Sequence, residues 1–264
     1  MNHLSLFDAH AHYDDHRFAA EYDGGTDRAI ADAHDAGICG IVNVGANLQS
    51  SRNSVELSGK YDFIYASVGI HPSDGDELGI DALSEAMLEI RKLAAHDKVV
   101  AIGEIGLDYH YDGTNRECQA AYFRAQMELA GELSLPVIIH SRDAMGDTLS
   151  ILSEYPSVTG VMHSFSGSAE IARQLCDKGW YISFSGPLTY RNAVHPKEAA
   201  AVIPEDRIMI ETDCPYLPPV PHRGELNSSI YLHYTCEAAA AIRGVSPERM
   251  ADITVANAKR FYRI

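Results

Sequence analysis

Short apolar runs rich in Val and Ile recur along the chain, and most of them are followed by a longer amphipathic stretch. The apolar runs end in polar residues and lie at residues 4–10, 37–45, 63–71, 99–107, 135–141, 158–165, 180–186 and 207–213. The clearest helical patterns lie at residues 26–37, 81–97, 116–133 and 169–179, and closing helices are expected from residue 227 to the end. Near-continuous apolar strands that alternate with helices predict a parallel sheet.

Eight such units in 264 residues predict an α/β fold, a single (β/α)8 TIM-like barrel that forms one domain over residues 1–264. A doubly wound open sheet is the alternative, but the first turn has no glycine-rich phosphate loop. No apolar run is long enough to span a membrane, and the N-terminus lacks the pattern of a secretory signal. The five widely spaced cysteines fit a reducing compartment. We therefore expect a cytoplasmic protein with no membrane partner and no obligate protein partner.

The formal net charge of −16 comes from 21 basic and 37 acidic residues. Such a surface disfavours tight binding along many phosphates of a nucleic acid, which needs a basic face. It leaves open a phosphate substrate that metal ions hold locally.

Histidines and carboxylates stand at the ends of six of the predicted strands. His10 and His12 are two residues apart at the end of the first strand, so they share one face. The other strand-end residues are Asp8, His71, Glu104, His140, His163 and Asp213. All strand C-termini of a barrel open onto one face, where active sites are built. Four of these histidines and two of the carboxylates are too many for one tetrahedral ion, so the set predicts two divalent metal ions, such as Zn, Mg or Mn.

A single strand-end histidine is more often a hydrogen-bonded structural residue, and only the whole set favours metal ligands, because a core buries unpaired polar groups at high cost. Asp8 is expected either to orient a histidine ring or to cap the turn backbone. Asp108 and Tyr109 are expected to line the pocket or to lie at the surface. His110 and His222 follow site strands and stay candidates. The other histidines are expected to be solvent-facing or structural; these are His3, His16, His34, His96, His195 and His233.

The chain resembles the TatD family of metal-dependent deoxyribonucleases, within the wider amidohydrolase-like hydrolases. The resemblance covers nearly the whole chain and rests on an ordered set of motifs: FDAHAH, VGIHP, AIGEIGLDYH, PVIIHSRDA, MHSFSGS, YISFSGPLTYRNA, IETDCPYLPPVPHRGELN and VANAKRFY. It implies a TIM-like barrel, a divalent-metal centre and cleavage of phosphodiester bonds in DNA.

The resemblance also implies a role for each ligand. His10, His12 and Asp213 would bind the first metal ion, Glu104 would bridge both ions, and His140 and His163 would hold the second. Asp213 and Glu104 are then the expected catalytic residues. Our hypothesis is that water or hydroxide held by the metal ions attacks the phosphate, and that Asp213 orients this nucleophile or accepts its proton.

His71 and Arg223 are the predicted phosphate contacts. The alternatives are a histidine bonded to a loop carbonyl and a solvated loop arginine. The chain also departs from the family after PHRG, because Leu226 stands where a second arginine is usual and Ser228–Ser229 replace Glu-Pro. If this loop contacts the substrate backbone, the lost cation would weaken or redirect substrate choice.

The sequence therefore predicts a deoxyribonuclease that acts on DNA or nucleotides, at strand ends or on single strands. One alternative keeps the metal centre and hydrolyses an ester or amide, including an aminoacyl-tRNA. A second alternative is a non-catalytic scaffold barrel, against which the complete ligand set argues.

Overall fold

Eight parallel strands form one sheet in the computed structural model, which describes residues 4–264. His3 lies outside the described residues. The strands are β1 (Leu6–Ala11), β2 (Ile38–Val44), β3 (Ile64–Val68), β4 (Val99–Asp108), β5 (Val137–Arg142), β6 (Gly160–Met162), β7 (Tyr181–Phe184) and β8 (Ile208–Ile210). Their order in the sheet follows the chain from β1 to β8.

The last strand returns to the first. Ala11 forms a parallel bridge with Cys214, and the His12 amide donates to the Cys214 carbonyl at 2.8 Å. The Asp213 amide donates to the His10 carbonyl at 2.9 Å. Eight sequential parallel strands whose ends meet make a (β/α)8 barrel, so the predicted fold class is confirmed.

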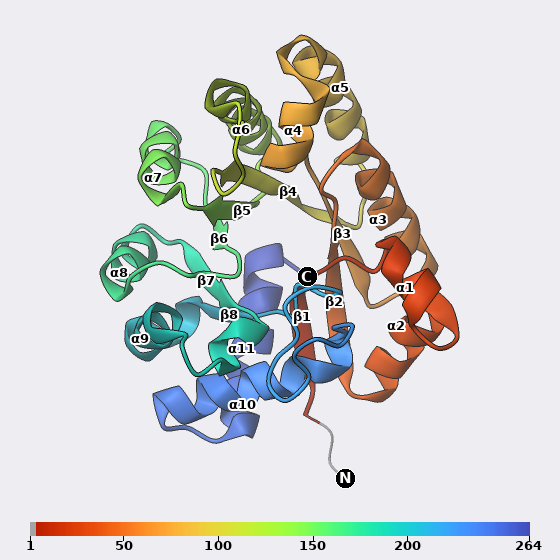
Figure 1. Cartoon of the computed structure of the whole chain (residues 1–264), viewed down its shortest axis with the longest axis vertical. Helices are drawn as coiled ribbons and strands as arrows, with labels where there is room; N and C mark the ends of the chain where they lie inside the picture. The colour runs from red at the N-terminus through yellow and green to blue at the C-terminus, as the bar shows by residue number, and fades with distance from the viewer. Residues whose placement is uncertain (1–3) are drawn as a thin grey trace. The chain divides into compact units, whose positions relative to one another are not determined.

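Helices follow the strands along the chain (Figure 1). They are α1 (His16–Glu21), α2 (Gly25–Asp35), α3 (Leu48–Lys60), α4 (Pro72–Leu78), α5 (Leu83–Leu93), α6 (Arg116–Leu133), α7 (Met145–Glu154), α8 (Ala169–Asp177), α9 (Val194–Val202), α10 (Leu232–Arg243) and α11 (Pro247–Tyr262), with short 3-10 helices η1 (Ile80–Ala82), η2 (Gly186–Thr189), η3 (Glu205–Arg207) and η4 (Ser229–Tyr231). None of the helices within residues 4–264 combines the length and the apolar character that crossing a bilayer requires.

By its internal contacts the chain divides into two compact units, and each is described by itself. The first unit contains the described residues up to Asn43 together with His163–Ile264, and the second contains Val44–Met162. That the 264 residues form a single domain stays a prediction.

In the second unit, α3 packs on β3 and α6 packs on β4. The helix α3 begins after Asn47, whose side chain accepts a hydrogen bond from the Ser50 amide. Its buried face carries serines, and the Ser51 hydroxyl donates to the Gly69 carbonyl and accepts from the Gly69 amide. These bonds hold the segment that follows β3, where the chain turns toward His71.

In the first unit, α11 packs on both β1 and β8. Ser246 caps its N-terminus and Pro247 occupies the first turn, which are the residue types preferred at those positions. The Asn257 side chain donates to the Ile208 carbonyl at 2.8 Å, and the Tyr262 hydroxyl donates to the Ala9 carbonyl at 2.8 Å. The closing helix thus bonds directly to the two strands that complete the sheet.

Three strands end three residues earlier than the sequence predicts. β3 ends at Val68, so His71 lies in the loop and forms the N-cap of α4. β6 ends at Met162 and β8 at Ile210. The reason lies just beyond the last two strands, where the backbone turns with positive φ values of 41° at Ser164 and 58° at Asp213. Apolar periodicity carries no signal for such a turn.

We predict that Gly106→Ala destabilises the protein, because Gly106 has a φ of 141° and an added Cβ would lie 1.9 Å from the His140 carbonyl oxygen. The expected loss is roughly 3 kcal/mol of unfolding free energy. Gly59→Ala is the control, since nothing lies within 4 Å of the added Cβ, and a small gain in stability is expected in a helix. Denaturant unfolding of both variants measures this. Equal stability of Gly106→Ala and the wild type would contradict the close approach of β4 and β5.

Candidate functional site

Three ligand-type side chains converge where β1 meets the segment after β8. The Nε2 atoms of His10 and His12 lie 3.1 Å apart, and Asp213 Oδ1 lies 3.6 Å from the first and 3.4 Å from the second. Two ligands bound at ~2.0–2.1 Å to one tetrahedral ion lie about 3.3 Å apart. The donor types and their spacing therefore fit one divalent ion.

The backbone places the Asp213 carboxylate in this group. Asp213 adopts a left-handed conformation that aspartate tolerates better than most residues, and its amide is bonded to the His10 carbonyl. Burial raises the pKa of Asp213, but the hydrogen bond to His12 and the charges of His163 and His10 outweigh it and hold the pKa below its usual value. The carboxylate is therefore ionised at neutral pH, as a metal ligand must be.

His163 belongs to the same compact unit and stacks on His10, with ring centroids 4.0 Å apart. Its Nδ1 lies 3.0 Å from Glu211 Oε1, and the same oxygen accepts from the Ser164 amide at 2.7 Å. A carboxylate facing Nδ1 favours the tautomer with the proton on that atom, so Nε2 keeps its lone pair for a ligand role. Sequence reasoning missed Glu211, although its position two residues before Asp213 in IETD was a usable signal.

The second unit holds a comparable arrangement around His140. Its Nδ1 lies 2.8 Å from Glu104 Oε1, and its Nε2 lies 3.2 Å from Asp108 Oδ2. If Nδ1 and Glu104 share an ion, Nε2 donates its proton to Asp108, the arrangement common to metal-binding histidines. His140 also belongs, with His71 and Asp108, to a group whose ligand atoms lie close enough together to hold a metal ion.

Asp108 is not a surface residue, because only 3% of it is exposed. Burial raises the pKa of Asp108, but hydrogen bonds from His140 and from the His110 amide lower it by more. The pKa therefore lies below its usual value. The interpretation that Asp108 supports a ring was not drawn from the sequence, since it depends on the direction of one side chain. Tyr109 is half-buried, and its hydroxyl donates to Asp147 at 2.9 Å.

His71 is fixed by the helix that it caps. Its Nδ1 accepts a hydrogen bond from the Ser73 amide at 3.2 Å, so the neutral ring carries its proton on Nε2. That Nε2 lies 4.0 Å from Glu104 Oε1, and the His71 and His140 rings lie 4.5 Å apart. Nδ1 thus bonds to the Ser73 amide and not to a carbonyl, and Nε2 is the nitrogen beside Glu104.

Asp8 bonds to backbone and hydroxyl groups and to no histidine ring in the contacts found. Its Oδ1 accepts from the Thr212 amide at 2.9 Å and the His10 amide at 3.4 Å. Its Oδ2 accepts from the Thr212 and Ser229 hydroxyls, each at 2.6 Å. Burial raises the pKa of Asp8 to about 6 despite these bonds. Of the two expected roles, the structure favours the capping one.

Two of the residues that depart from the family pattern after PHRG, Ser228 and Ser229, make contacts within the fold. Ser229 replaces the proline of the family pattern and anchors the loop to Asp8, while Ser228 lies 3.4 Å from the Tyr13 hydroxyl. Both serines are buried, with 0% and 1% exposed respectively. Only the Leu226 departure, which is half-buried, stays a candidate for altered substrate contact.

Arg223 is exposed, and its guanidinium carbon lies 4.5 Å from the centroid of the Tyr190 ring. His222 packs into an aromatic cluster, stacked on Tyr231 at 3.9 Å. His110 forms an exposed pair with Asp143 at 3.1 Å. The contacts of His222 and His110 are explained without a metal ion.

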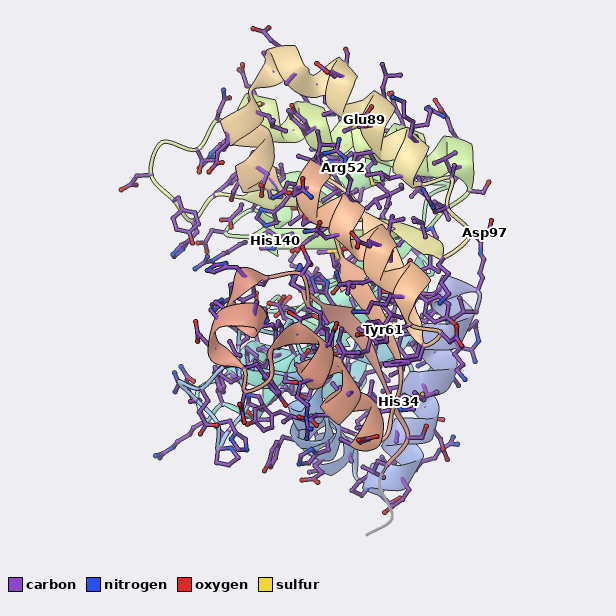
Figure 2. All side chains as sticks on the ribbon, turned by 90° about the vertical axis from the view of Figure 1, so that its right-hand side faces the viewer. His34, Arg52, Tyr61, Glu89, Asp97 and His140 are labelled. Atoms are coloured by element: carbon purple, nitrogen blue, oxygen red, sulfur yellow. The ribbon has the colours of Figure 1, made fainter. Side chains whose placement is uncertain are left out.

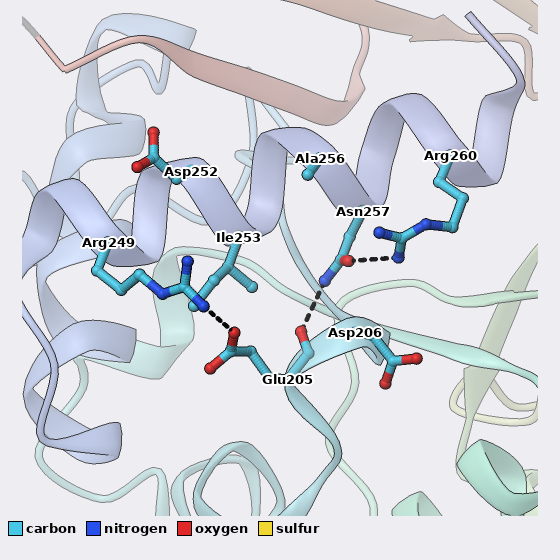
Figure 3. Close-up of a pocket in the computed structure, with 8 residues that line it drawn as sticks. All are labelled: Glu205, Asp206, Arg249, Asp252, Ile253, Ala256, Asn257 and Arg260. Atoms are coloured by element: carbon cyan, nitrogen blue, oxygen red, sulfur yellow. Dashed lines mark hydrogen bonds and ion pairs between the residues drawn. The ribbon is translucent and has the colours of Figure 1, made fainter.

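A cavity of about 550 Å³ lies between η3 and α11, away from these groups (Figure 3). Arg249 pairs with Glu205 there, and Arg260 bonds to Asn257. Because η3 precedes β8, this is the N-terminal end of a barrel strand, where side chains serve stability more than chemistry.

The fold is a (β/α)8 barrel that carries groups of His, Asp and Glu side chains able to hold metal ions. Residues 7–263 match the family described as TatD related DNase, and the chain belongs to that family. It is a metal-dependent hydrolase, and the predicted family and enzyme class are confirmed.

Its relatives include the uncharacterized metal-dependent hydrolase YabD of Bacillus subtilis, 45% identical over 261 residues, 98% of this chain and 99% of that protein. The 3'-5' ssDNA/RNA exonuclease TatD of Citrobacter rodentium is 33% identical over 245 residues, 90% of this chain and 92% of that one. The crystal structure of the TatD homologue YjjV from Escherichia coli superposes with a TM-score of 0.89 at 26% identity, covering 99% of both chains.

We predict that Asp108→Asn and Glu211→Gln each weaken metal binding by about 10- to 100-fold, because each carboxylate orients a histidine ring. Asp143→Asn is the control, since the Asp143 side chain is 66% exposed and pairs only with His110 in the contacts found. Calorimetric titration of the metal-free proteins with Zn²⁺ or Mn²⁺ measures the affinities. Affinities equal to that of Asp143→Asn would rule out an orienting role.

Proposed function

We propose that this protein is a two-metal nuclease that hydrolyses phosphodiester bonds of DNA or RNA at strand ends or in single strands. The observation that carries the proposal is the convergence of His10, His12 and Asp213 within 3.1–3.6 Å in a chain of the TatD related DNase family. The exonuclease activity named for the Citrobacter relative supports the substrate class.

The ligand assignment is part of the proposal. His10, His12 and Asp213 hold one ion, and Glu104 and His140 contribute to a second. The bridging role of Glu104 and the assignment of His163 to the second ion stay predictions from the family resemblance. Zn²⁺, Mn²⁺ and Mg²⁺ all suit such imidazole and carboxylate donors.

The bound ions would supply Lewis acidity toward the phosphoryl oxygens and would lower the pKa of water toward neutrality. The chain's own residues then orient and neutralise. The ionised Asp213 accepts a hydrogen bond from the attacking water and can take its proton. His71 donates from Nε2 to a phosphate oxygen, because its Nδ1 is already occupied by the Ser73 amide. Arg223 is the second proposed phosphate contact, since it is exposed and its guanidinium is held over the Tyr190 ring.

The charge of the protein favours capture of one phosphate over tracking along a duplex. A net charge of −16 repels a polyanion, so affinity must come from groups local to the site. This supports strand ends or flexible single strands as substrates.

We expect chelation to abolish hydrolysis of end-labelled single-stranded DNA and RNA, and Mn²⁺, Zn²⁺ or Mg²⁺ to restore it. His12→Ala should lose more than about 100-fold in turnover, since a direct ligand contributes more than the outer partners whose loss costs ~10–100-fold. His195→Ala, whose side chain is 67% exposed, is the matched control. A panel of carboxylic esters and an aminoacyl-tRNA runs in parallel. Chelator-sensitive cleavage of these, with DNA and RNA intact, would replace the nuclease with the ester hydrolase.

We expect His71→Asn to separate the structural role of His71 from its proposed role in binding. Asparagine is a good N-cap and can still accept from the Ser73 amide, but it lacks the Nε2 donor. The unfolding free energy should stay within about 1 kcal/mol of the wild type, while kcat/KM falls about 10- to 100-fold from the lost charge-assisted bond. His71→Ala should lose both. Wild-type kinetics of a folded His71→Asn protein would leave His71 as a helix cap only.

A further inference from the structure

Exposed arginines of the second unit generally pair with acidic side chains. This is expected where acidic residues outnumber basic ones by 37 to 21. Figure 2 labels one such pair, Arg52 on α3 and Glu89 on α5, whose charged groups lie 3.4 Å apart. The other pairs are Arg91 with Glu132 and Arg124 with Glu154.

Arg116 and Arg142 contact tyrosine rings instead of carboxylates. The guanidinium carbon of Arg116 lies 4.1 Å from the centroid of the Tyr109 ring, and that of Arg142 lies 5.5 Å from the centroid of the Tyr111 ring. Arg142 Nη1 also reaches the Tyr111 hydroxyl at 3.5 Å. Within residues 4–264, neither arginine forms an ion pair with a carboxylate.

Carboxylates are available nearby but bind other groups. Asp143, the residue after Arg142, pairs with His110, and Asp147 accepts from the Tyr109 hydroxyl. Neither guanidinium group therefore has a carboxylate in direct contact, although the charge of Arg142 helps to lower the pKa of Asp108 on the neighbouring strand. A protein with a large acidic excess would neutralise such groups easily, so we take their stacking on tyrosines as a sign of an anionic ligand.

The two arginines and their tyrosines lie close in sequence to His140 and Asp108 of the candidate metal site. Arg142 lies two positions after His140 on β5, so both side chains project to the same side of the strand. Tyr109 follows Asp108, and its amide donates to the Arg142 carbonyl at 2.9 Å. Tyr111 is 61% exposed in the loop that continues from Tyr109. We call Tyr109, Tyr111, Arg116 and Arg142 the tyrosine–arginine surface.

We propose that the tyrosine–arginine surface binds the nucleotides that flank the scissile phosphate, and that it selects single-stranded nucleic acid. This inference rests on the proposed function. A guanidinium has five N–H donors, and in the contacts found Arg142 uses only one at Nη1, toward the Tyr111 hydroxyl, which leaves others for phosphate oxygens. An exposed tyrosine ring stacks on a base of any sequence, but only where the base is not paired. Arg223 on Tyr190 repeats the arrangement in the other compact unit.

The test compares Tyr111→Ala and Arg142→Gln with Arg124→Gln in the full-length chain. Arg124 is an exposed arginine of the same unit that pairs with Glu154, so its substitution controls for loss of a surface cation. Binding of a fluorescent single-stranded oligothymidylate is measured by anisotropy over a range of salt concentrations. We expect Tyr111→Ala and Arg142→Gln to bind about 5- to 100-fold more weakly, and Arg124→Gln to bind as the wild type does.

The salt dependence separates the two roles. Arg142→Gln should lower the slope of log affinity against log salt by about 0.7, the value for one lost phosphate contact on a single strand. Tyr111→Ala should weaken binding and leave that slope unchanged, because stacking releases no counterions. A duplex of the same sequence should bind the wild type and Tyr111→Ala alike. An unchanged slope in Arg142→Gln, or equal losses in the Arg124→Gln control, would overturn the inference.

Activity provides the second readout and keeps the two proposals apart. The metal-loaded proteins are assayed on the oligonucleotide and on bis(p-nitrophenyl) phosphate, which has a phosphodiester but no base and no neighbouring phosphate. The loss of kcat/KM in Tyr111→Ala and Arg142→Gln should be at least about 5-fold greater on the oligonucleotide. Equal losses on both substrates would reduce the surface to structural support. If the wild type cleaves neither substrate, the proposed function fails, and the binding data alone decide the inference.

Discussion

The junction between β1 and the segment after β8 is the constraint on which the first donor group depends. Two backbone hydrogen bonds, from Asp213 to His10 and from His12 to Cys214, set the register of this junction. Asp8 reinforces it by accepting from both an amide and a hydroxyl of Thr212. Because these groups are buried, a register shift would leave several of them unsatisfied, at a cost of about 1–3 kcal/mol each. The hydrogen bonds that close the sheet therefore also bring His10, His12 and Asp213 together.

Histidines of the site are oriented by different partners, and the partner determines what each ring can do. His163 faces a carboxylate through Nδ1, which favours a lone pair on Nε2, whereas His140 has a carboxylate beside each ring nitrogen. His71 faces a backbone amide, which favours a proton on Nε2. The same residue type can therefore present a lone pair in one place and an N–H donor in another. Strand-end position alone does not distinguish these roles.

The sequence predicts which residues stand at strand ends, but it does not predict which partner orients each side chain. Alternation of apolar strands with helices predicts the barrel, and the barrel predicts that strand-end residues such as His10, His12 and Asp213 gather at one end, since that follows from topology. The roles of Glu211 and Asp108 were not predicted, because each depends on which way a side chain turns after its strand ends. The position of His71 was wrong for a related reason, since β3 stops before it and a helix cap takes over.

Acidic composition and a nucleic-acid substrate conflict only if charge is spread evenly, and here it is not. Arginines on the outer helices form ion pairs with carboxylates, as in Arg52–Glu89 and Arg124–Glu154. Those near the ends of β4 and β5 stack on tyrosines. Stacking fixes a guanidinium at little cost in side-chain entropy and leaves its hydrogen-bonding edge open. On the proposed function, the acidic remainder repels duplexes and bulk polyanion, while the arginines over Tyr109 and Tyr111 and the exposed Tyr111 ring would admit a strand whose bases are already unpaired. Net charge would then limit where on the protein a nucleic acid can bind, and the two arginines without a carboxylate in contact would mark the place.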